Sequence, residues 1–231
     1  MKVVIYGING KMGRVLYDEV LKNKDLYFVG GISSKEDKQA AIYKSLDDVE
    51  VPDVIIDFSH PSNLLEILEY SIVHKVALVL ATTSYTTKDH NMIKDVSLQI
   101  PIIYSENYSL GINTILNSIK TYVTTLNNFD IDILEKHHKY KLDAPSGTAI
   151  KLKKEISKYR DIDIPVHSLR SGNIVGEHSV IFSGEDEVVE INHKINSKKV
   201  FALGAIKAAK FITKKNYGLY NIDDLLGDKY E

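Results

Sequence analysis

The first hundred residues alternate short apolar runs with helical patterns, and this alternation restricts the fold more than any other feature. Apolar runs predict strands at residues 2–6, 26–32, 54–58, 76–80 and 102–104. Patterns of helical period predict helices at residues 12–20, 64–73 and 88–96. Strands that alternate with helices form a parallel sheet covered on both faces. We therefore predict an α/β fold with a Rossmann-like, doubly wound parallel sheet.

The first strand runs into a glycine-rich turn. Gly7, Gly10 and Gly13 separate it from the first helix. Glycines at such a turn let a pyrophosphate approach the helix N-terminus, although the GxxGxxG spacing also suits a simple tight turn. The cofactor contacts predicted in this turn are Gly7, Ile8, Asn9, Gly10, Lys11 and Met12.

The second predicted strand ends in Ser33-Ser34-Lys35. A dinucleotide-binding fold commonly carries an acidic residue here, which binds the adenine ribose. Small hydroxyls and a lysine would instead accept a ribose 2′-phosphate, so Ser34 and Lys35 are predicted cofactor contacts. A surface turn with an incidental lysine explains the same residues, and both NADH and NADPH stay open as cofactors.

Polar residues also follow the other predicted strands, and the carboxyl ends of parallel strands meet at one edge of a sheet. We expect Gly7, Ser33, Ser59, Thr82 and Asn107 to line that edge. The remaining predicted cofactor contacts are Ala81, Thr82, Thr83, Ser105, Glu106, Asn107 and Tyr108. Ordinary turn formation is the alternative for these residues, and we expect a structural role for His60.

The pattern changes after Tyr108, which predicts a second, α+β domain. Its predicted elements are helices at 111–126, 149–158 and 201–212 and strands at 130–137, 165–170, 178–182 and 188–193. The last two strands form a predicted hairpin, and residues 218–227 a short tail. The first domain therefore ends near residue 109.

The loop at residues 135–148 concentrates the groups suited to chemistry. His137 and His138 titrate near neutrality, and Lys141 adds a positive charge. Ser146 can cap the following helix, whose first amides, at Gly147 and Thr148, would then bind an anion. A solvated basic loop is the alternative. His178 and His193 fall within strands, where we expect packed histidines without a catalytic role.

Composition excludes several classes of function. A net charge of −2 argues against a nucleic-acid partner. The longest apolar run, residues 76–81, is too short to cross a membrane, and no signal peptide precedes the first strand, so we expect a cytoplasmic protein. The chain has no cysteine, which excludes disulfides, thiolate metal sites and a cysteine nucleophile. We expect no metal site.

Several motifs together resemble the 4-hydroxy-tetrahydrodipicolinate reductase (dihydrodipicolinate reductase) family. They are residues 7–13, 81–83, 107–113, 135–149, 201–205 and 218–220. The resemblance implies hydride transfer from NADH or NADPH to a dihydrodipicolinate-type dicarboxylate, with loss of a hydroxyl as water, giving tetrahydrodipicolinate. It places the enzyme in lysine biosynthesis through diaminopimelate, and it also implies a homotetramer. The resemblance further implies a dinucleotide-binding domain of residues 1–109 with 213–231, and a substrate-binding and oligomerisation domain of residues 110–212.

The same resemblance assigns roles within the loop. His137 corresponds to the proton donor and acceptor and Lys141 to a second proton donor, while His138, Gly147 and Thr148 correspond to groups that hold the substrate carboxylates. The chain departs from the family pattern where Ala81 and Ser84 replace glycines and where Ser105-Glu106 replaces a small apolar pair.

Two other functions fit parts of the sequence. Another two-domain dehydrogenase would share the fold but not the loop at residues 135–148. A non-catalytic dinucleotide sensor would keep the fold without needing a proton donor beside an anion site. An aldehyde dehydrogenase that uses a thiol nucleophile is excluded by the absence of cysteine.

Overall fold

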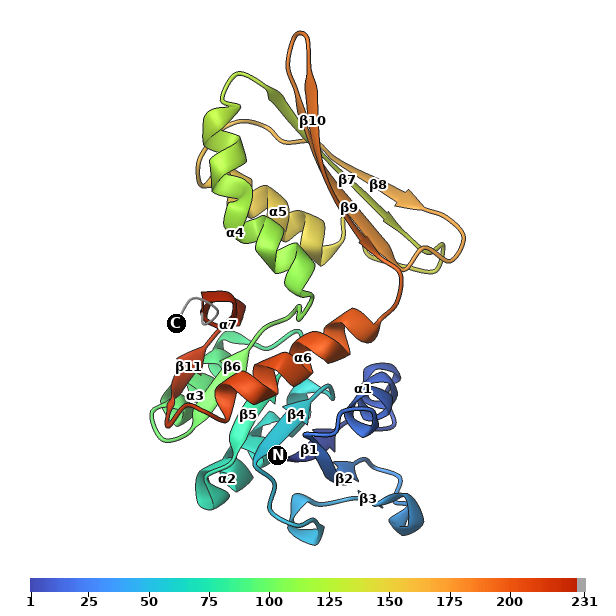
Figure 1. The fold of residues 1–231 in the computed structure, drawn as a ribbon, viewed down its shortest axis with the longest axis vertical. Helices are drawn as coiled ribbons and strands as arrows, with labels where there is room; N and C mark the ends of the chain where they lie inside the picture. The colour runs from blue at the N-terminus through green and yellow to red at the C-terminus, as the bar shows by residue number, and fades with distance from the viewer. Residues whose placement is uncertain (228–231) are drawn as a thin grey trace. The chain divides into compact units, whose positions relative to one another are not determined.

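The chain divides into two compact units in the computed structural model, which describes residues 1–227 (Figure 1). The first unit contains Met1–Ser109 and the chain from Lys199 onward, and the second is Leu110–Lys198. The predicted second boundary, after residue 212, differs from this division. Helix α6 (Lys199–Ile212) belongs to the first unit, because its buried alanines pack on helix α1 (Lys11–Leu21) and on the sheet.

A seven-stranded sheet forms the centre of the first unit, with strand order β11-β6-β5-β4-β1-β2-β3. Its strands are β1 (Lys2–Tyr6), β2 (Tyr27–Ile32), β3 (Ile42–Tyr43), β4 (Val54–Asp57), β5 (Ala77–Leu80), β6 (Pro101–Tyr104) and β11 (Gly218–Tyr220). Every neighbouring pair is parallel. The predicted doubly wound sheet is confirmed.

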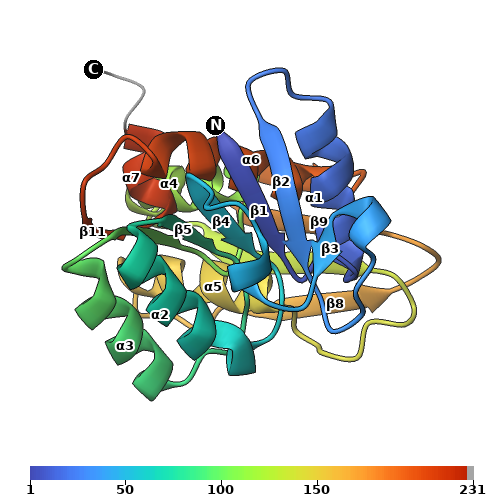
Figure 2. The ribbon, with the colours of Figure 1, turned by 90° about the horizontal axis from the view of Figure 1, so that it is seen from below.

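Helices cover both faces of this sheet (Figure 2). Helices α1 and α6 pack together on one face, and α2 (Leu64–His74) and α3 (Thr87–Ser97) contribute to the core of the other. Strands buried on both sides need continuous apolar sequence, and Val3, Val4 and Ile5 are fully buried. The carboxyl ends of the strands therefore share one edge, as the sequence predicted.

Two strands escaped prediction because they are short. Strand β3 has two residues and follows a 3₁₀ turn at Lys38–Ala40. Strand β11 lies in the predicted tail, where it pairs with β6 and extends the sheet, before helix α7 (Ile222–Gly227). Runs of two or three residues carry too little periodicity to be detected. Further 3₁₀ turns lie at Leu46–Asp48 and Pro61–Asn63.

The second unit has a four-stranded sheet of order β10-β9-β7-β8. Its strands are β7 (Asp130–His137), β8 (Val166–Arg170), β9 (Gly176–Ser183) and β10 (Val188–Ile195). Helices α4 (Leu110–Thr125) and α5 (Gly147–Ser157) pack on the same face. Strands β9 and β10 form the predicted antiparallel hairpin, whereas β7 and β8 are parallel.

Alternation along β7 and β9 carries polar groups into this core face. Ile131 and Ile133 are buried against the helices, and Glu135 continues the same face with no exposed surface. His178 of β9 lies directly opposite Glu135, on the same face of that strand as Val180 and Phe182. A carboxylate and an imidazole thus occupy positions where the pattern would otherwise place apolar side chains.

None of the helices within residues 1–227 combines the length and the apolar character needed to cross a membrane.

Close packing of α6 generates a prediction about stability. A Cβ at Gly204 would lie 1.8 Å from the carbonyl oxygen of Tyr108, so Gly204→Ala must displace the helix. We expect a loss of about 1–3 kcal/mol in the free energy of unfolding, measured as a lower midpoint in urea. Leu203→Ala, at a half-exposed position of the same helix, should change it by less than about 0.5 kcal/mol. A higher midpoint for Gly204→Ala, as helix propensity alone predicts, would contradict this packing.

Candidate active site

Helix α5 begins at the end of the histidine loop, and one side chain caps its first turn. Ser146 is the N-cap, and its Oγ accepts a hydrogen bond from the amide of Ala149 at 3.2 Å. Gly147 is exposed, and a Cβ there would meet no atom within 4 Å. The first turn of the helix carries no acidic residue. This helix start, at Gly147 and Thr148, therefore has the character of an anion site, and its binding of a carboxylate stays a prediction.

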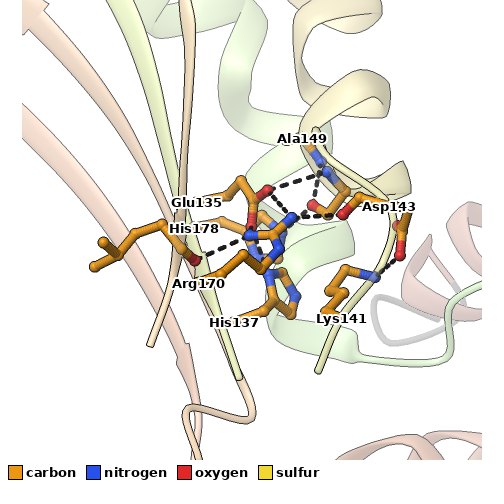
Figure 3. A network of polar contacts seen from close by, with 9 residues as sticks. Glu135, His137, Lys141, Asp143, Ala149, Arg170 and His178 are labelled. Atoms are coloured by element: carbon orange, nitrogen blue, oxygen red, sulfur yellow. Dashed lines mark hydrogen bonds and ion pairs between the residues drawn. The ribbon is translucent and has the colours of Figure 1, made fainter. Parts of the chain in front are cut away.

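Glu135 is the centre of the polar network around this loop (Figure 3). Arg170 of β8 binds both carboxylate oxygens, at 2.9 Å from Nη1 and 2.6 Å from Nη2. The amide of Ser146 donates to Oε1 at 3.2 Å. Burial alone would raise the pKa of Glu135, but hydrogen bonds from Arg170, Ser168 and His137 outweigh it and lower that pKa to about 2. Glu135 is therefore ionised at neutral pH.

His137 lies against this carboxylate. Its Nδ1 is 2.5 Å from Glu135 Oε2, and an ionised carboxylate can only accept, so Nδ1 carries the proton. Nε2 is then the ring atom that gains and loses a proton. Burial lowers the pKa of His137, and Glu135 opposes that effect. Such an imidazole can act as a general acid or base near neutrality.

The other predicted residues of the loop have different surroundings. Lys141 Nζ donates to Asp143 Oδ1 at 2.7 Å, so an ion pair within the loop holds its ammonium. Nδ1 of His138 is buried without a hydrogen-bond partner among the described residues. A buried polar atom without a partner is costly, and a bound ligand would satisfy it.

Two residues of this network were missed at the sequence level. His178, as expected, is a packed histidine, but its Nε2 lies 2.9 Å from Ser146 Oγ and its ring centroid 5.2 Å from that of His137. Burial and the neighbouring His137 lower the pKa of His178 to about 4, so it is neutral at neutral pH. Arg170 gave no signal, because its place beside His137 depends on the parallel pairing of β7 with β8.

In the first unit, the glycine turn forms a cradle after β1. Gly7 has a φ of +83°, which favours glycine. A Cβ at Gly13 would lie 2.2 Å from the carbonyl oxygen of Gly7, so the helix can approach the turn only without a side chain there. Gly10 is the N-cap of α1 and makes no side-chain hydrogen bond. The start of this helix is therefore open to an anion and fits the pyrophosphate of a dinucleotide.

A pocket of about 470 Å³ opens at this cradle. It is lined by Tyr6, Gly7, Asn9, Gly10, Ile32, Ser33, Ser34, Lys44, Phe58, Ser59, His60, Asn63 and Glu66. Gly7, Asn9, Gly10 and Ser34 were predicted cofactor contacts. Lys35 does not line the pocket, whereas Lys44, which follows the undetected strand β3, does.

His60 combines two roles at this pocket. Its Nδ1 accepts the amide of Ser62 at 3.2 Å and caps the 3₁₀ turn, as its expected structural role requires. It also lines the pocket.

Of the other predicted cofactor contacts, residues 81–83 and 105–108 follow β5 and β6, while Ile8, Lys11 and Met12 belong to the glycine turn and the start of α1; none of them lines this pocket. Thr82 is buried and donates to Asp57 Oδ2 at 2.7 Å, which fixes its hydroxyl. Tyr108 is 1% exposed, and the carbonyl oxygens of Leu80 and Ile103 share the one hydrogen of its hydroxyl, at 3.0 and 3.1 Å. Its side chain therefore belongs to the core. Ile8 is also buried, packed over Gly31.

Comparison with known proteins agrees on one family. The family model described as dihydrodipicolinate reductase, N-terminus, matches residues 1–108, and the one described as dihydrodipicolinate reductase, C-terminus, matches residues 111–226. A 4-hydroxy-tetrahydrodipicolinate reductase from Clostridium novyi (strain NT) is 38% identical over 99% of both chains. One from Exiguobacterium sibiricum is 44% identical over 83% of this chain and 84% of its own.

Solved structures show the same fold. A dipicolinate-bound dihydrodipicolinate reductase from Paenisporosarcina sp. TG-14 aligns with a TM-score of 0.82 at 22% identity, over 97% of this chain and 98% of that one. A DAP dehydrogenase from C. glutamicum, in complex with DAP, aligns with a TM-score of 0.56 at 12% identity, over 99% of each chain.

Proposed function

Because the chain belongs to the dihydrodipicolinate reductase family, we propose that His137 and Lys141 supply the protons of its reaction and that the start of α5 holds the substrate. The chain is an NAD(P)H-dependent 4-hydroxy-tetrahydrodipicolinate reductase, an oxidoreductase of lysine biosynthesis through diaminopimelate. The observation that carries the residue assignment is the hydrogen bond between His137 Nδ1 and Glu135, which leaves Nε2 to exchange protons.

Proton transfer at Nε2 matches the chemical need of this reaction. A bound reduced nicotinamide supplies the hydride. Hydride addition leaves the substrate ring as an enamine, which requires a proton at carbon. His137 is half-buried beside an ionised carboxylate, which stabilises the imidazolium that donates this proton. General acid catalysis of this kind contributes about 10²- to 10⁴-fold. Lys141 is the second donor and assists the loss of the hydroxyl as water.

Two groups are suited to hold the carboxylates of the substrate. The amides at Gly147 and Thr148 lie in the first turn of α5, where a helix favours an anion, and the buried Nδ1 of His138 has no hydrogen-bond partner among residues 1–227. Fixing both carboxylates orients the ring for proton transfer. Retention of this whole set argues against a non-catalytic sensor.

We further propose the roles of the two units. The glycine cradle and its pocket support dinucleotide binding by the first unit, and the histidine loop supports substrate binding by the second. Helices cover one face of the four-stranded sheet, and the other face presents Leu169 at 45% exposure. This uncovered face supports assembly of a cytoplasmic homotetramer through the second unit, which light scattering would measure.

The direct test of the activity is nicotinamide oxidation by the purified protein, with substrate formed in place from pyruvate and aspartate semialdehyde. We expect loss of NADH or NADPH absorbance that depends on the condensation product. Dinucleotide binding without turnover would favour the sensor.

Substitution of the two adjacent histidines separates their roles. We expect His137→Gln to lower kcat by about 10²-fold or more with little change in KM, because it removes the proton donor. His138→Gln should mainly raise KM, because it removes a contact with a substrate carboxylate. Steady-state kinetics of both variants measure this. Equal losses of kcat at unchanged KM would contradict this division of roles.

The pocket of the first unit generates a prediction about cofactor choice. Lys44 lines the pocket beside Ser33 and Ser34, where a ribose 2′-phosphate would meet its charge. We expect Lys44→Ala to raise the Kd for NADPH roughly 5- to 10-fold, by loss of a partly screened charge contact. The Kd for NADH should stay within about twofold, as measured by fluorescence titration.

Lys35→Ala is the comparison, because Lys35 lies in the same segment but outside the pocket lining. It should change both dissociation constants by less than about twofold. Parallel weakening of NADH and NADPH binding by Lys44→Ala would show that Lys44 does not distinguish them.

A further inference from the structure

Glu135 connects two parts of the site that carry different tasks. Its Oε2 accepts from Nδ1 of His137, the proposed proton donor. Its Oε1 accepts from the amide of Ser146, the N-cap of the helix whose first turn is the proposed carboxylate site. One buried carboxylate therefore fixes the distance between the proton donor and the start of α5.

Arg170 holds that carboxylate in place. Both of its terminal nitrogens bind Glu135, and Nη2 also donates to the carbonyl of Asp143 at 2.6 Å. A two-bond contact between a guanidinium and a carboxylate fixes direction as well as distance. Strand β7, strand β8 and the loop ahead of α5 are thus joined at one point.

Folding alone does not require a carboxylate at this position. Glu135 follows Ile131 and Ile133 on the core face, where an apolar side chain would continue the pattern. A buried ion pair contributes about as much stability as well-packed apolar residues, or less. The pair is therefore better explained by the groups that it orients than by a gain in stability.

We propose that Glu135, held by Arg170, is a positioning residue that aligns the imidazole of His137 with the carboxylate site at the start of α5. This inference rests on the proposed role of His137 as proton donor. Glu135 has no exposed surface, so it acts through its contacts with His137 and Ser146.

The charges around His137 predict opposite effects for the two partners. Glu135 on β7 raises the pKa of His137, whereas Arg170 on β8 and Lys141 in the loop lower it. His178 on β9 is neutral at neutral pH, with His193 of β10 opposite it, and Asp143 is paired with Lys141. Removing the Glu135 charge should therefore lower the pKa of His137, and removing the Arg170 charge should raise it.

The test is Glu135→Gln, measured by the pH dependence of kcat and by an NMR titration of His137 in the enzyme without substrate. The rate requires protonated His137, so it falls as pH rises through the pKa of that group. We expect this fall to move about one pH unit lower, together with the NMR titration. We also expect kcat to fall by up to about 100-fold while KM rises, because both tasks lose their alignment.

Arg170→Gln should move both the fall of kcat with rising pH and the NMR titration of His137 to higher pH. The matched control is Glu177→Gln, on the neighbouring strand β9, where Glu177 pairs with Lys136 and Lys194 outside the site. It should leave kcat within about twofold and the pH profile unmoved. An unchanged far-UV circular dichroism spectrum and an unchanged midpoint of thermal unfolding show that each variant is folded. If Glu135→Gln does not fold, Glu135→Asp is the second variant. It keeps the negative charge but places it on a shorter side chain, so kcat and KM should change while the pH at which kcat falls stays nearly the same.

The outcomes separate two failures. If Glu135→Gln lowers kcat but changes neither the pKa of His137 measured by NMR nor the pH at which kcat falls, the positioning role is overturned and only a structural role is left. Unchanged kcat and KM for Glu135→Asp overturn it as well. A shifted NMR titration with no change in the pH at which kcat falls supports control of the ring by Glu135, but refutes His137 as the proton donor.

Discussion

An ionised carboxylate with no exposed surface must find its partners inside the protein, and this constraint organises the second unit. Glu135 meets it with four hydrogens in place of water: two from Arg170 and one each from His137 and Ser146. Each partner can reach the carboxylate only if its own segment of the chain lies at a defined distance from Glu135. Strand β8, the loop and the first turn of α5 are all fixed by it.

The packing of the first unit depends on glycines, which have no side chain, at two positions where the backbone of another segment comes close. The carbonyl oxygen of Gly7 lies where a Cβ of Gly13 would be, and the carbonyl oxygen of Tyr108 lies where a Cβ of Gly204 would be. These close approaches bring α1 to the end of β1 and α6 to the sheet. The first leaves a bare helix start beside a pocket, and the second holds α6 in the first unit.

Most of the fold could be read from periodicity, and most of the loop from residue type. Long apolar runs and the helices between them gave the parallel sheet, and the antiparallel hairpin was found between β9 and β10. Strands β3 and β11 were missed because each is too short to show a period. The predicted second boundary differs from the division of the structure, because the alanine-rich pattern of α6 indicates close packing without saying which unit the helix packs on.

The sequence by itself determined the chemistry available: glycines after the first strand, and two histidines, a lysine and a capped helix start in one loop. These are local features, and spacing along the chain is enough to reveal them. Only the tertiary structure decided that Arg170, His178 and Glu135 surround His137, and that Lys44 rather than Lys35 lines the pocket. Those contacts join residues up to 41 positions apart, as His137 and His178 are. They arise from strand pairing and register, which periodicity does not specify.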